Sequence, residues 1–406
     1  MRMGAYYGAK TLTLCAASAD GSSKGLRNSA PRSLYQVPPI ALACKVGEDV
    51  DRIILHSKLE ARECTTERGW TLQESLLSRR VFIFSHQLYW CCVSADAGCE
   101  GARVKLPITA NRNFGPPESL VPGIFPAEIL RDYPLKEQWY LGVQDFSKRR
   151  LGVASDKLLA ISAFALWVHD RFRVRDGDGD VGESVTYVAG MFLSTRDTDE
   201  LVRQLFWRPP KTASCSRPTA YRAPSWSWAA VDGELELRDG RFAGDTCFVF
   251  EAFDLELTHN SAPYGSVKNA ALHLSSCQIR ALIECLKYPI RVEEDASVVS
   301  EDGLCLLPDT PDDATLIRSS LVTATPSLYL FRLSEGELHL GHWMSGSRSF
   351  YGCLGLILLP VSDKEPDIFR RLGSFDFYRT RREIETQEDA ESGSFFDVEG
   401  TSITLV

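Results

Sequence analysis

The sequence predicts an α+β fold with a partial α/β unit at its N-terminus, central helices and a mostly antiparallel β region at its C-terminus. Helical and strand patterns alternate over the first hundred residues, apolar residues then recur at helical spacing, and the final part of the chain changes to period two. The predicted segments are residues 1–99, a Pro-rich linker at 100–134, a helical region at 135–215 and a β-rich region at 216–406.

The composition is that of a globular chain. Its 406 residues give room for two or three units, at about 150 residues per domain. Lys and Arg number 45 and Asp and Glu 54, so the net charge is −9, which argues against broad binding to nucleic acid or anionic lipid. No apolar window reaches the roughly 18 residues of a membrane span. We therefore expect protein partners of unknown identity, no nucleic acid and no membrane, and the oligomeric state stays open.

The cysteines favour the cytoplasm over a secreted setting. There are 12 of them at irregular spacings and without any CxxC pair, so neither a disulfide framework nor a structural zinc site is expected. The N-terminus imitates a signal peptide, but Lys10 and two threonines leave too short an apolar run. The sequence thus predicts a cytoplasmic protein without a metal or another cofactor.

In the first segment, a helix over residues 1–7 leads to a strand over 11–17 and a Ser/Gly/Pro-rich loop over 20–39. One or two strands follow at 40–55. Leu72, Leu76 and Leu77 then have helical spacing, and VFIF and LYWCC on either side of Ser85-His86-Gln87 predict a hairpin.

The later segments follow from the same rules. Six prolines between residues 107 and 134 exclude regular structure there. Helices are expected over residues 135–148, 156–172, 184–194 and 198–207. Beyond them, the stretches CFVFEAFDLELTH, ALHLSSCQIRALI, SLYLFRL, ELHLGHW and CLGLILLPV each predict a strand of an antiparallel sheet or barrel.

Several short motifs match the residue pattern of known sites but lack the other features that those sites need. The segment Gly21–Gly25 spells G-x-S-x-G, but no helix pattern follows to orient the serine. Gly177–Gly182 spells GxGxxG, yet its aspartates would repel a pyrophosphate and it lacks the residues of a calcium loop. His339 and His342 should point to opposite faces of a strand and cannot share a metal. We interpret all of these as structural.

Glu74 is the one carboxylate that we single out as a candidate acid or base. It lies three residues after Thr71, and the pair can form a capping box, which would start the helix near Thr71. Capping accounts for Glu74 without catalysis and is the favoured interpretation. Trp226 and Trp228 should share a face if their segment is extended, where core packing is favoured over a ligand platform.

The segment RGWTLQESLLSRRVFIFSHQLYWCC resembles the third conserved block of the fungal heterokaryon incompatibility (HET) domain. The opening helix, strand and Ser-rich loop resemble the stretch just upstream of that block. The matching residues are Gly69, Trp70, Thr71, Leu72, Gln73, Glu74, Arg79 and Trp90.

Three further segments resemble the region that commonly follows this domain. They are SKRRLGVASDKLLAISAFA with Asp156 and Lys157, YRAPSWSWAAVDG, and YGCLGLILLPV followed by FRRLGSF. The second of these supplies Pro224, Ser225, Trp226, Ser227, Trp228 and Asp232. Each motif is moderately specific by itself, and their order makes the resemblance stronger.

The resemblance implies a TIR-like N-terminal unit and a role in fungal non-self recognition, where fusion of incompatible cells triggers programmed cell death. The family's first two blocks have no match in this sequence, so the resemblance implies a truncated domain. A real truncated paralogue and a misplaced start at Met1 are both consistent with that departure. The strands that would frame a ligand crevice are among the unmatched blocks, and no catalytic residue carries over.

Two functional hypotheses follow from the resemblance. The first is a non-catalytic HET-family protein that acts through protein contacts. The second is an enzyme that hydrolyses NAD or modifies a small metabolite, because some TIR domains cleave NAD, with Glu74 as its acid or base.

Overall fold

The computed structural model describes residues 3–17, 19, 23, 40–46, 49–55, 67–84, 88–92, 95–98, 101–104, 134–175, 185–194, 196–210, 213–237, 242–285, 290–292, 298–300, 304–324, 327–339, 349–380 and 398–406. The chain divides into two compact units, residues 2–132 and residues 133–406. The segments predicted as helical (135–215) and β-rich (216–406) therefore belong to one unit. Most of the Pro-rich stretch lies outside the described residues.

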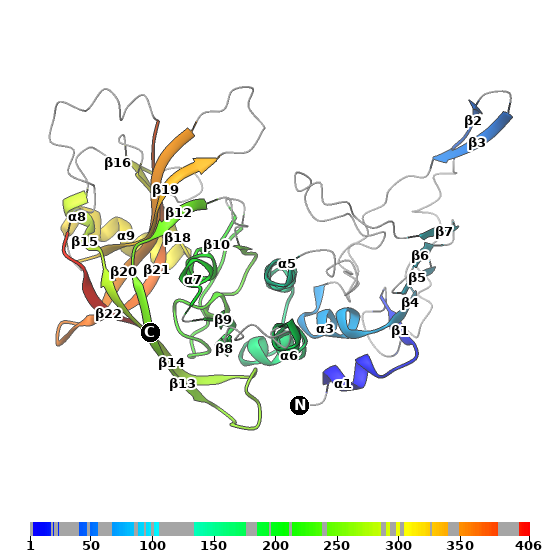
Figure 1. Cartoon of the computed structure of the whole chain (residues 1–406), viewed down its shortest axis with the longest axis horizontal. Coiled ribbons are helices and arrows are strands. Elements are labelled where there is room, and N and C mark those ends of the chain that lie inside the picture. Colours follow the sequence, from blue (N-terminus) through cyan, green and yellow to red (C-terminus); the bar gives the residue numbers. More distant parts are fainter. Residues whose placement is uncertain are drawn as a thin grey trace. The chain divides into compact units, whose positions relative to one another are not determined.

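The first unit contains a five-stranded sheet in the order β1-β4-β5-β6-β7 (Figure 1). The strands β1 and β4 are parallel, and the pairs β4–β5, β5–β6 and β6–β7 are antiparallel. The predicted strand at 11–17 and the VFIF–LYWCC hairpin are confirmed as β1 and β4–β5. The bounds are β1 Thr13–Ala16, β4 Arg80–Phe84, β5 Leu88–Cys92, β6 Ala95–Gly98 and β7 Gly101–Val104.

A TIR-like unit needs a mainly parallel sheet, and this one gives it no support, because β1–β4 is the single parallel pair among its described strands. The core of the sheet consists of Ala17, Val81 and Ile83, against which Cys15 packs. The alternating burial of β4 follows from the pleat of the strand, which turns successive side chains to opposite faces.

Two helices and a hairpin complete the described part of the first unit. The helix α1 spans Met3–Gly8 and α3 spans Gly69–Leu77, which confirms both predicted helices. As the leucine spacing predicted, Leu72, Leu76 and Leu77 are buried. The antiparallel hairpin of β2 (Ile40–Val46) and β3 (Asp49–Leu55) accounts for the strands expected at 40–55.

The second unit begins with two packed helices, as predicted. These are α5 (Leu135–Ser147) and α6 (Lys157–Arg175), the latter preceded by the 3-10 turn η3 (Ala154–Asp156). Trp139 of α5 stacks on Phe164 of α6 with ring centroids 5.5 Å apart. Gly142 permits this approach, since a Cβ atom there would lie 2.2 Å from the Phe164 ring.

The helix predicted at 184–194 is wrong, because this segment forms the hairpin of β8 (Thr186–Val188) and β9 (Met191–Leu193). Its two turn residues, Ala189 and Gly190, have φ values of 47° and 98°. Positive φ at both central positions is the requirement of a type I′ hairpin turn. The next predicted helix is confirmed as α7 (Thr198–Leu205), which Asp197 caps by accepting from the Glu200 backbone N–H at 3.0 Å.

The large C-terminal sheet is curled and mostly antiparallel, as predicted (Figure 1). Among its described pairs, β21–β22 is parallel and the others are antiparallel. Its strands are β12 Phe242–Thr246, β13 Val249–Leu257, β14 Val267–Cys277, β15 Ile279–Ala281, β16 Ile290–Val292, β17 Val298–Ser300, β18 Leu304–Pro308, β19 Tyr329–His339, β20 Ser349–Ser362, β21 Glu365–Thr380 and β22 Thr401–Leu405.

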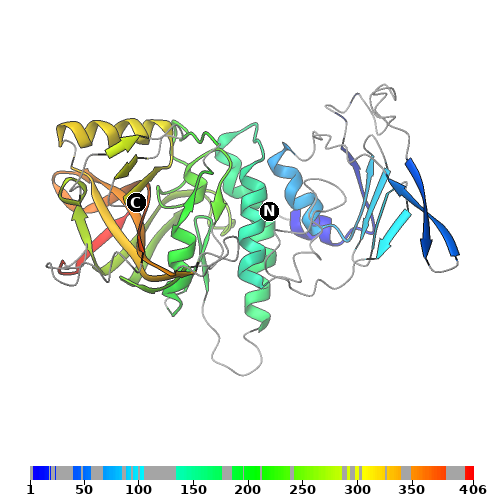
Figure 2. The ribbon, with the colours of Figure 1, turned by 90° about the horizontal axis from the view of Figure 1, so that it is seen from above.

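Two features of this region depart from the sequence prediction. SLYLFRL and ELHLGHW, predicted as separate strands, both contribute to the single strand β19, whose register with β20 shifts between Arg332 and Ser334. The helix α9 (Pro311–Thr323) was not predicted; it lies alongside the curled sheet (Figure 2), where Ile317 joins the buried cluster of Leu330, Ile357 and Phe375. The remaining short elements are α8 Leu282–Cys285, η5 Trp228–Ala230, β10 Trp207–Arg208 and β11 Glu236–Leu237.

The β8–β9 turn yields a stability prediction. An alanine at Gly190 would be strained at φ 98° and would place its Cβ atom 2.9 Å from Nε1 of Trp228. We expect Gly190→Ala to lower the free energy of unfolding by about 1–3 kcal/mol, measured by urea denaturation. Gly152→Ala is the matched control, because a Cβ atom there has no heavy atom within 4 Å. Equal stability of the two variants would contradict the prediction.

Candidate functional site

Glu74 lies on α3 and is paired with Tyr7 of α1. The Tyr7 hydroxyl donates a hydrogen bond to the Glu74 carboxylate. Burial raises the pKa of Glu74, while the Tyr7 hydrogen bond and the charge of Arg68 partly oppose this rise. Burial, with the Glu74 charge, raises the pKa of Tyr7 to about 12. The pair is thus a carboxyl group that holds its proton more tightly than usual beside a phenol that stays protonated.

The predicted capping box of Thr71 and Glu74 is wrong. The helix begins two residues earlier, at Gly69, and its cap residue Arg68 makes no side-chain cap bond. The Thr71 hydroxyl instead donates to the Arg68 carbonyl oxygen at 2.6 Å, which is a bond made inside the first turn. Capping therefore does not account for Glu74. Its neighbours Leu72 and Gln73 are buried, so this part of the motif builds the unit's core.

The other motif residues converge in the second unit around Lys157. Its ammonium group donates to the carbonyl oxygen of Val231 and lies 3.4 Å from Oδ1 of Asp232. Arg222 reaches the same carboxylate, with Nη1 2.9 Å from Oδ1 of Asp232. Lys157 also lies 5.6 Å from the centroid of the Trp228 ring. The structure thus brings together two segments that the sequence singled out separately.

The tryptophans of the third motif are buried and serve the core. Their segment is a turn followed by η5, so they do not share the face of a strand. Nε1 of Trp226 donates to the Leu405 carbonyl oxygen at 3.1 Å, and Nε1 of Trp228 donates to that of Gly190 at 2.7 Å. These bonds satisfy both indoles, as core packing requires. Asp156 ends η3 directly before Lys157, and the Pro224 carbonyl accepts from the Ser227 N–H at 3.0 Å.

Arg371, which the sequence did not single out, forms a fully buried ion pair with Asp309. Nη2 and Nε of Arg371 donate to the two carboxylate oxygens at 2.8 and 2.9 Å. The guanidinium also stacks on Trp207, 3.5 Å from the ring centroid, and donates to the carbonyl oxygens of Leu205 and Trp207. Arg217 adds a third bond to Asp309 at 3.1 Å. Neither Arg371 nor Asp309 has any exposed side-chain area, so the pair holds the fold together.

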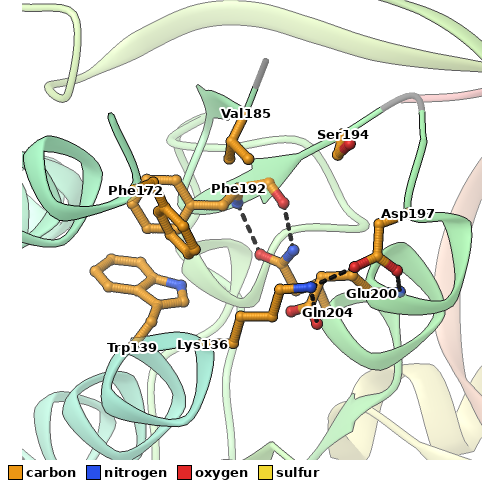
Figure 3. A pocket seen from close by; sticks show the side chains of 9 residues that line it. All are labelled: Lys136, Trp139, Phe172, Val185, Phe192, Ser194, Asp197, Glu200 and Gln204. Carbon is orange, nitrogen blue, oxygen red and sulfur yellow. Dashed lines mark hydrogen bonds and ion pairs between the residues drawn. The ribbon is translucent and has the colours of Figure 1, made fainter. Parts of the chain in front are cut away.

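A pocket opens between α5, α6, the β8–β9 hairpin and α7 (Figure 3). One wall is aromatic, from Trp139, Phe172 and Phe192, and the opposite wall is polar. Nine residues line the pocket: Lys136, Trp139, Phe172, Val185, Phe192, Ser194, Asp197, Glu200 and Gln204. The sequence nominated none of them, because they come from four elements whose packing has no local signature.

The polar wall is organised by Lys136. Its ammonium group bonds to Oδ2 of Asp197 and lies 3.4 Å from Oε2 of Glu200. Tyr140 donates to the other oxygen of Glu200. Burial raises the pKa of the Glu200 carboxyl, against the lowering effect of the Lys136 charge. Gln204 is fixed separately by two bonds with the backbone of Phe192 (Figure 3).

His169 bonds to the backbone of Val185, one of the residues that line the pocket. Nε2 of His169 lies 3.0 Å from the Val185 carbonyl oxygen, and Nδ1 lies 2.6 Å from the Tyr264 hydroxyl. A carbonyl oxygen can only accept, so Nε2 carries a proton, and in the neutral ring Nδ1 accepts from the Tyr264 hydroxyl. His169 therefore fixes the backbone at Val185, which lines the pocket.

The remaining predicted sites give no further candidate. Across the part of the chain that the structure describes, no group of three or more His, Cys, Asp or Glu residues could hold a metal ion, and no helix is long and apolar enough to cross a membrane. Of the G-x-S-x-G segment only Ser23 is described. Gly177–Gly182 and His342 lie outside the described residues, and His339 ends β19.

No family model, curated protein or solved structure matches this chain. The resemblance to the heterokaryon incompatibility family therefore depends on the motifs alone, and the chemistry of the sites must be argued from their geometry.

The burial of Lys157 makes stability depend on pH. Burial lowers the pKa of its ammonium group from 10.5 to about 8, with the nearby Arg222 charge acting in the same direction. Between these two values the unfolded chain binds more protons than the folded protein, so the free energy of unfolding rises with pH. We expect the unchanged chain to gain stability relative to Lys157→Met between pH 8 and 10, by up to about 1.4 kcal/mol per pH unit.

Urea denaturation of both proteins at several pH values measures this difference. Lys148→Met is the matched control, since Lys148 is a largely exposed lysine paired with Glu234 at 3.2 Å. A stability difference between the unchanged chain and Lys157→Met that stays constant across this pH range would contradict a lowered pKa.

Proposed function

We propose that this chain is a heterokaryon incompatibility family protein that acts in fungal non-self recognition or programmed cell death through protein contacts rather than catalysis. The order of its motifs supports the family. One structural observation supports the mode of action: the side chains of the motifs in the second unit bind the chain's own backbone and one another. Motifs used in this way build a scaffold and leave no reactive group for a substrate.

The Lys157 cluster illustrates this point. Buried lysines with lowered pKa values often act as nucleophiles, but a nucleophile must reach a substrate. Lys157 is 3% exposed, and its ammonium group is bonded to Val231 and Asp232. The cluster is therefore suited to holding η3 and α6 against the segment that carries the tryptophans.

The acidic composition and the lack of a membrane-spanning helix in the described residues agree with a cytoplasmic protein partner. In this proposal, the partner is a protein whose identity differs between incompatible strains. The scaffold presents a surface to it, and the outcome is growth arrest or cell death.

Expression in fungal hyphae tests the proposal. We expect the chain to reduce growth or viability in at least one strain background, relative to an empty vector. Glu74→Gln should act like the unchanged chain, because contacts and not chemistry produce the effect. Normal growth in every background, with the protein present at detectable levels, would contradict the proposal.

A second candidate function, nucleotide hydrolysis of the TIR kind, is favoured by one observation. Glu74 is a half-buried carboxyl with a raised pKa beside the Tyr7 hydroxyl, which is the setting of a general acid. Its weakness is the sheet of the first unit, which gives no support to a TIR-like fold.

Purified protein incubated with NAD distinguishes the two functions. If the second candidate is right, nicotinamide is released, and Glu74→Gln loses this release while the matched control Glu67→Gln keeps it. From the leading proposal we expect no release by any of the three proteins. A release that depends on Glu74 would overturn the non-catalytic proposal.

A further inference from the structure

We propose that the outer edge of β13 is a docking surface for an extended segment of a partner protein in which basic and apolar residues alternate. The segment adds to the curled sheet as a further strand beside β13. The proposal deepens the proposed function, on which it rests for the idea of a protein partner, by naming the surface and the chemistry of the segment that binds there.

The first observation is an open strand edge. Among the described strands, β13 pairs with β14 alone (Figure 1), and the pairing is regular over Ala252–Glu256, between two register shifts. A strand that pairs on one side turns alternate backbone N–H and C=O groups away from its neighbour, where they are a template for another strand. β13 also lacks the proline and lysine that block many edge strands. Its backbone is therefore suited to recognition by strand addition.

The second observation is an acidic row on one face of β13. The side chains of Ala252, Asp254 and Glu256 are exposed. Nε2 of His273 lies 2.8 Å from Oδ2 of Asp254, and Nζ of Lys268 lies 2.8 Å from Oε1 of Glu256. Both bonds come from β14, on the inner side of β13. The two acidic side chains are 74% and 62% exposed, and a carboxylate has about four lone-pair positions, so their outer side can accept from lysine or arginine on an added strand.

The third observation is an apolar row on the opposite face. Phe253, Leu255 and Leu257 alternate with the exposed residues and are half-buried. Phe253 and Leu255 pair with Leu272 and Ala270 of β14, which are buried. Apolar residues at every second position of an added strand would extend this row and cover its outer side. Because successive side chains point to opposite faces, the two rows together select a segment in which basic and apolar residues alternate.

The charges also distinguish a partner protein from a second copy of this chain. β13 carries Glu251, Asp254 and Glu256 and has no lysine or arginine. Two β13 edges that paired with each other would bring carboxylates together, and like charges on adjacent strands are destabilising. The same carboxylates attract a basic segment. The edge is therefore closed to its own copy and open to a strand of opposite charge.

Labelled peptides test the docking surface on the purified full chain. The probe alternates lysine and valine. A peptide of the same composition with its lysines grouped at one end controls for general attraction to the chain's net charge of −9, and a peptide of alternating glutamate and valine reverses the charge. Fluorescence anisotropy measures binding, and hydrogen–deuterium exchange locates it. We expect the probe to bind about tenfold more tightly than either control, to slow exchange within residues 249–257, and to lose affinity as salt is added.

Substitutions on the exposed face provide the second part of the test. Ala252→Lys adds a positive charge beside the docked lysines and should weaken probe binding by about fivefold. Val322→Lys is the matched control, because it adds the same charge on α9, where Val322 is 85% exposed, and it should leave binding unchanged. Asp254→Asn keeps an oxygen that can accept from His273 and removes one negative charge, so it should also weaken binding.

Three results would overturn the docking surface: equal binding of the alternating and grouped peptides, slowed exchange outside β13 alone, or equal effects of Ala252→Lys and Val322→Lys. Sedimentation that shows a dimer with β13 protected from exchange would assign the edge to a second copy and would overturn it as well. Probe binding at β13 with normal growth of hyphae would support the docking surface and contradict the proposed function. An effect on growth without probe binding would contradict the docking surface alone.

Discussion

The second unit is built around an ion pair, Arg371 with Asp309, that is entirely removed from water. Arg371 and Asp309 have no exposed side-chain area, and a buried ion pair is tolerated only when both partners are fully bonded. Asp309 takes two bonds from Arg371 and a third from Arg217. Arg371 places its remaining donors on the carbonyl oxygens of Leu205 and Trp207. The pair therefore connects β21 and the start of α9 to the end of α7, and so joins the helical part of the unit to the curled sheet.

The same constraint extends along the chain to the tryptophan motif. The backbone N–H of Arg371 donates to Oγ of Ser225 at 2.8 Å, and Ser225 in turn bonds to the carbonyl oxygen of Val406. Trp207, on which Arg371 stacks, donates from Nε1 to Trp226 at 2.8 Å. This sequence of bonds explains why segments that look like separate motifs belong to one compact unit, and why the region predicted as helical is not a domain by itself.

Local patterns in the sequence predicted many of the helices and strands, but they could not predict contacts between residues far apart in the chain. The strands β13, β14, β19 and β20 of the curled sheet, and the helices α5 and α6, follow from periodicity. The hairpin at 186–193 was missed because its turn depends on positive φ at Ala189, a residue without a turn signature. The helix α9 was missed although Thr310 and Pro311 form an ordinary cap and first turn. The capping box failed because Thr71 lies inside the helix. Lys136 and Asp197 meet across 61 positions of the chain, and no spacing rule reaches that far.

The motif clusters and the pocket follow the same rule in the second unit. In the clusters of Arg371 and Lys157, the charged groups are bonded to partners within the protein, so a ligand there would have to replace bonds that hold the fold. The polar wall of the pocket is bonded in the same way, since Lys136 pairs with Asp197 and Glu200, and Gln204 pairs with the backbone of Phe192. These bonds therefore hold α5, α7 and the β8–β9 hairpin together, as the bonds of the motifs hold η3 and α6 against the tryptophan segment.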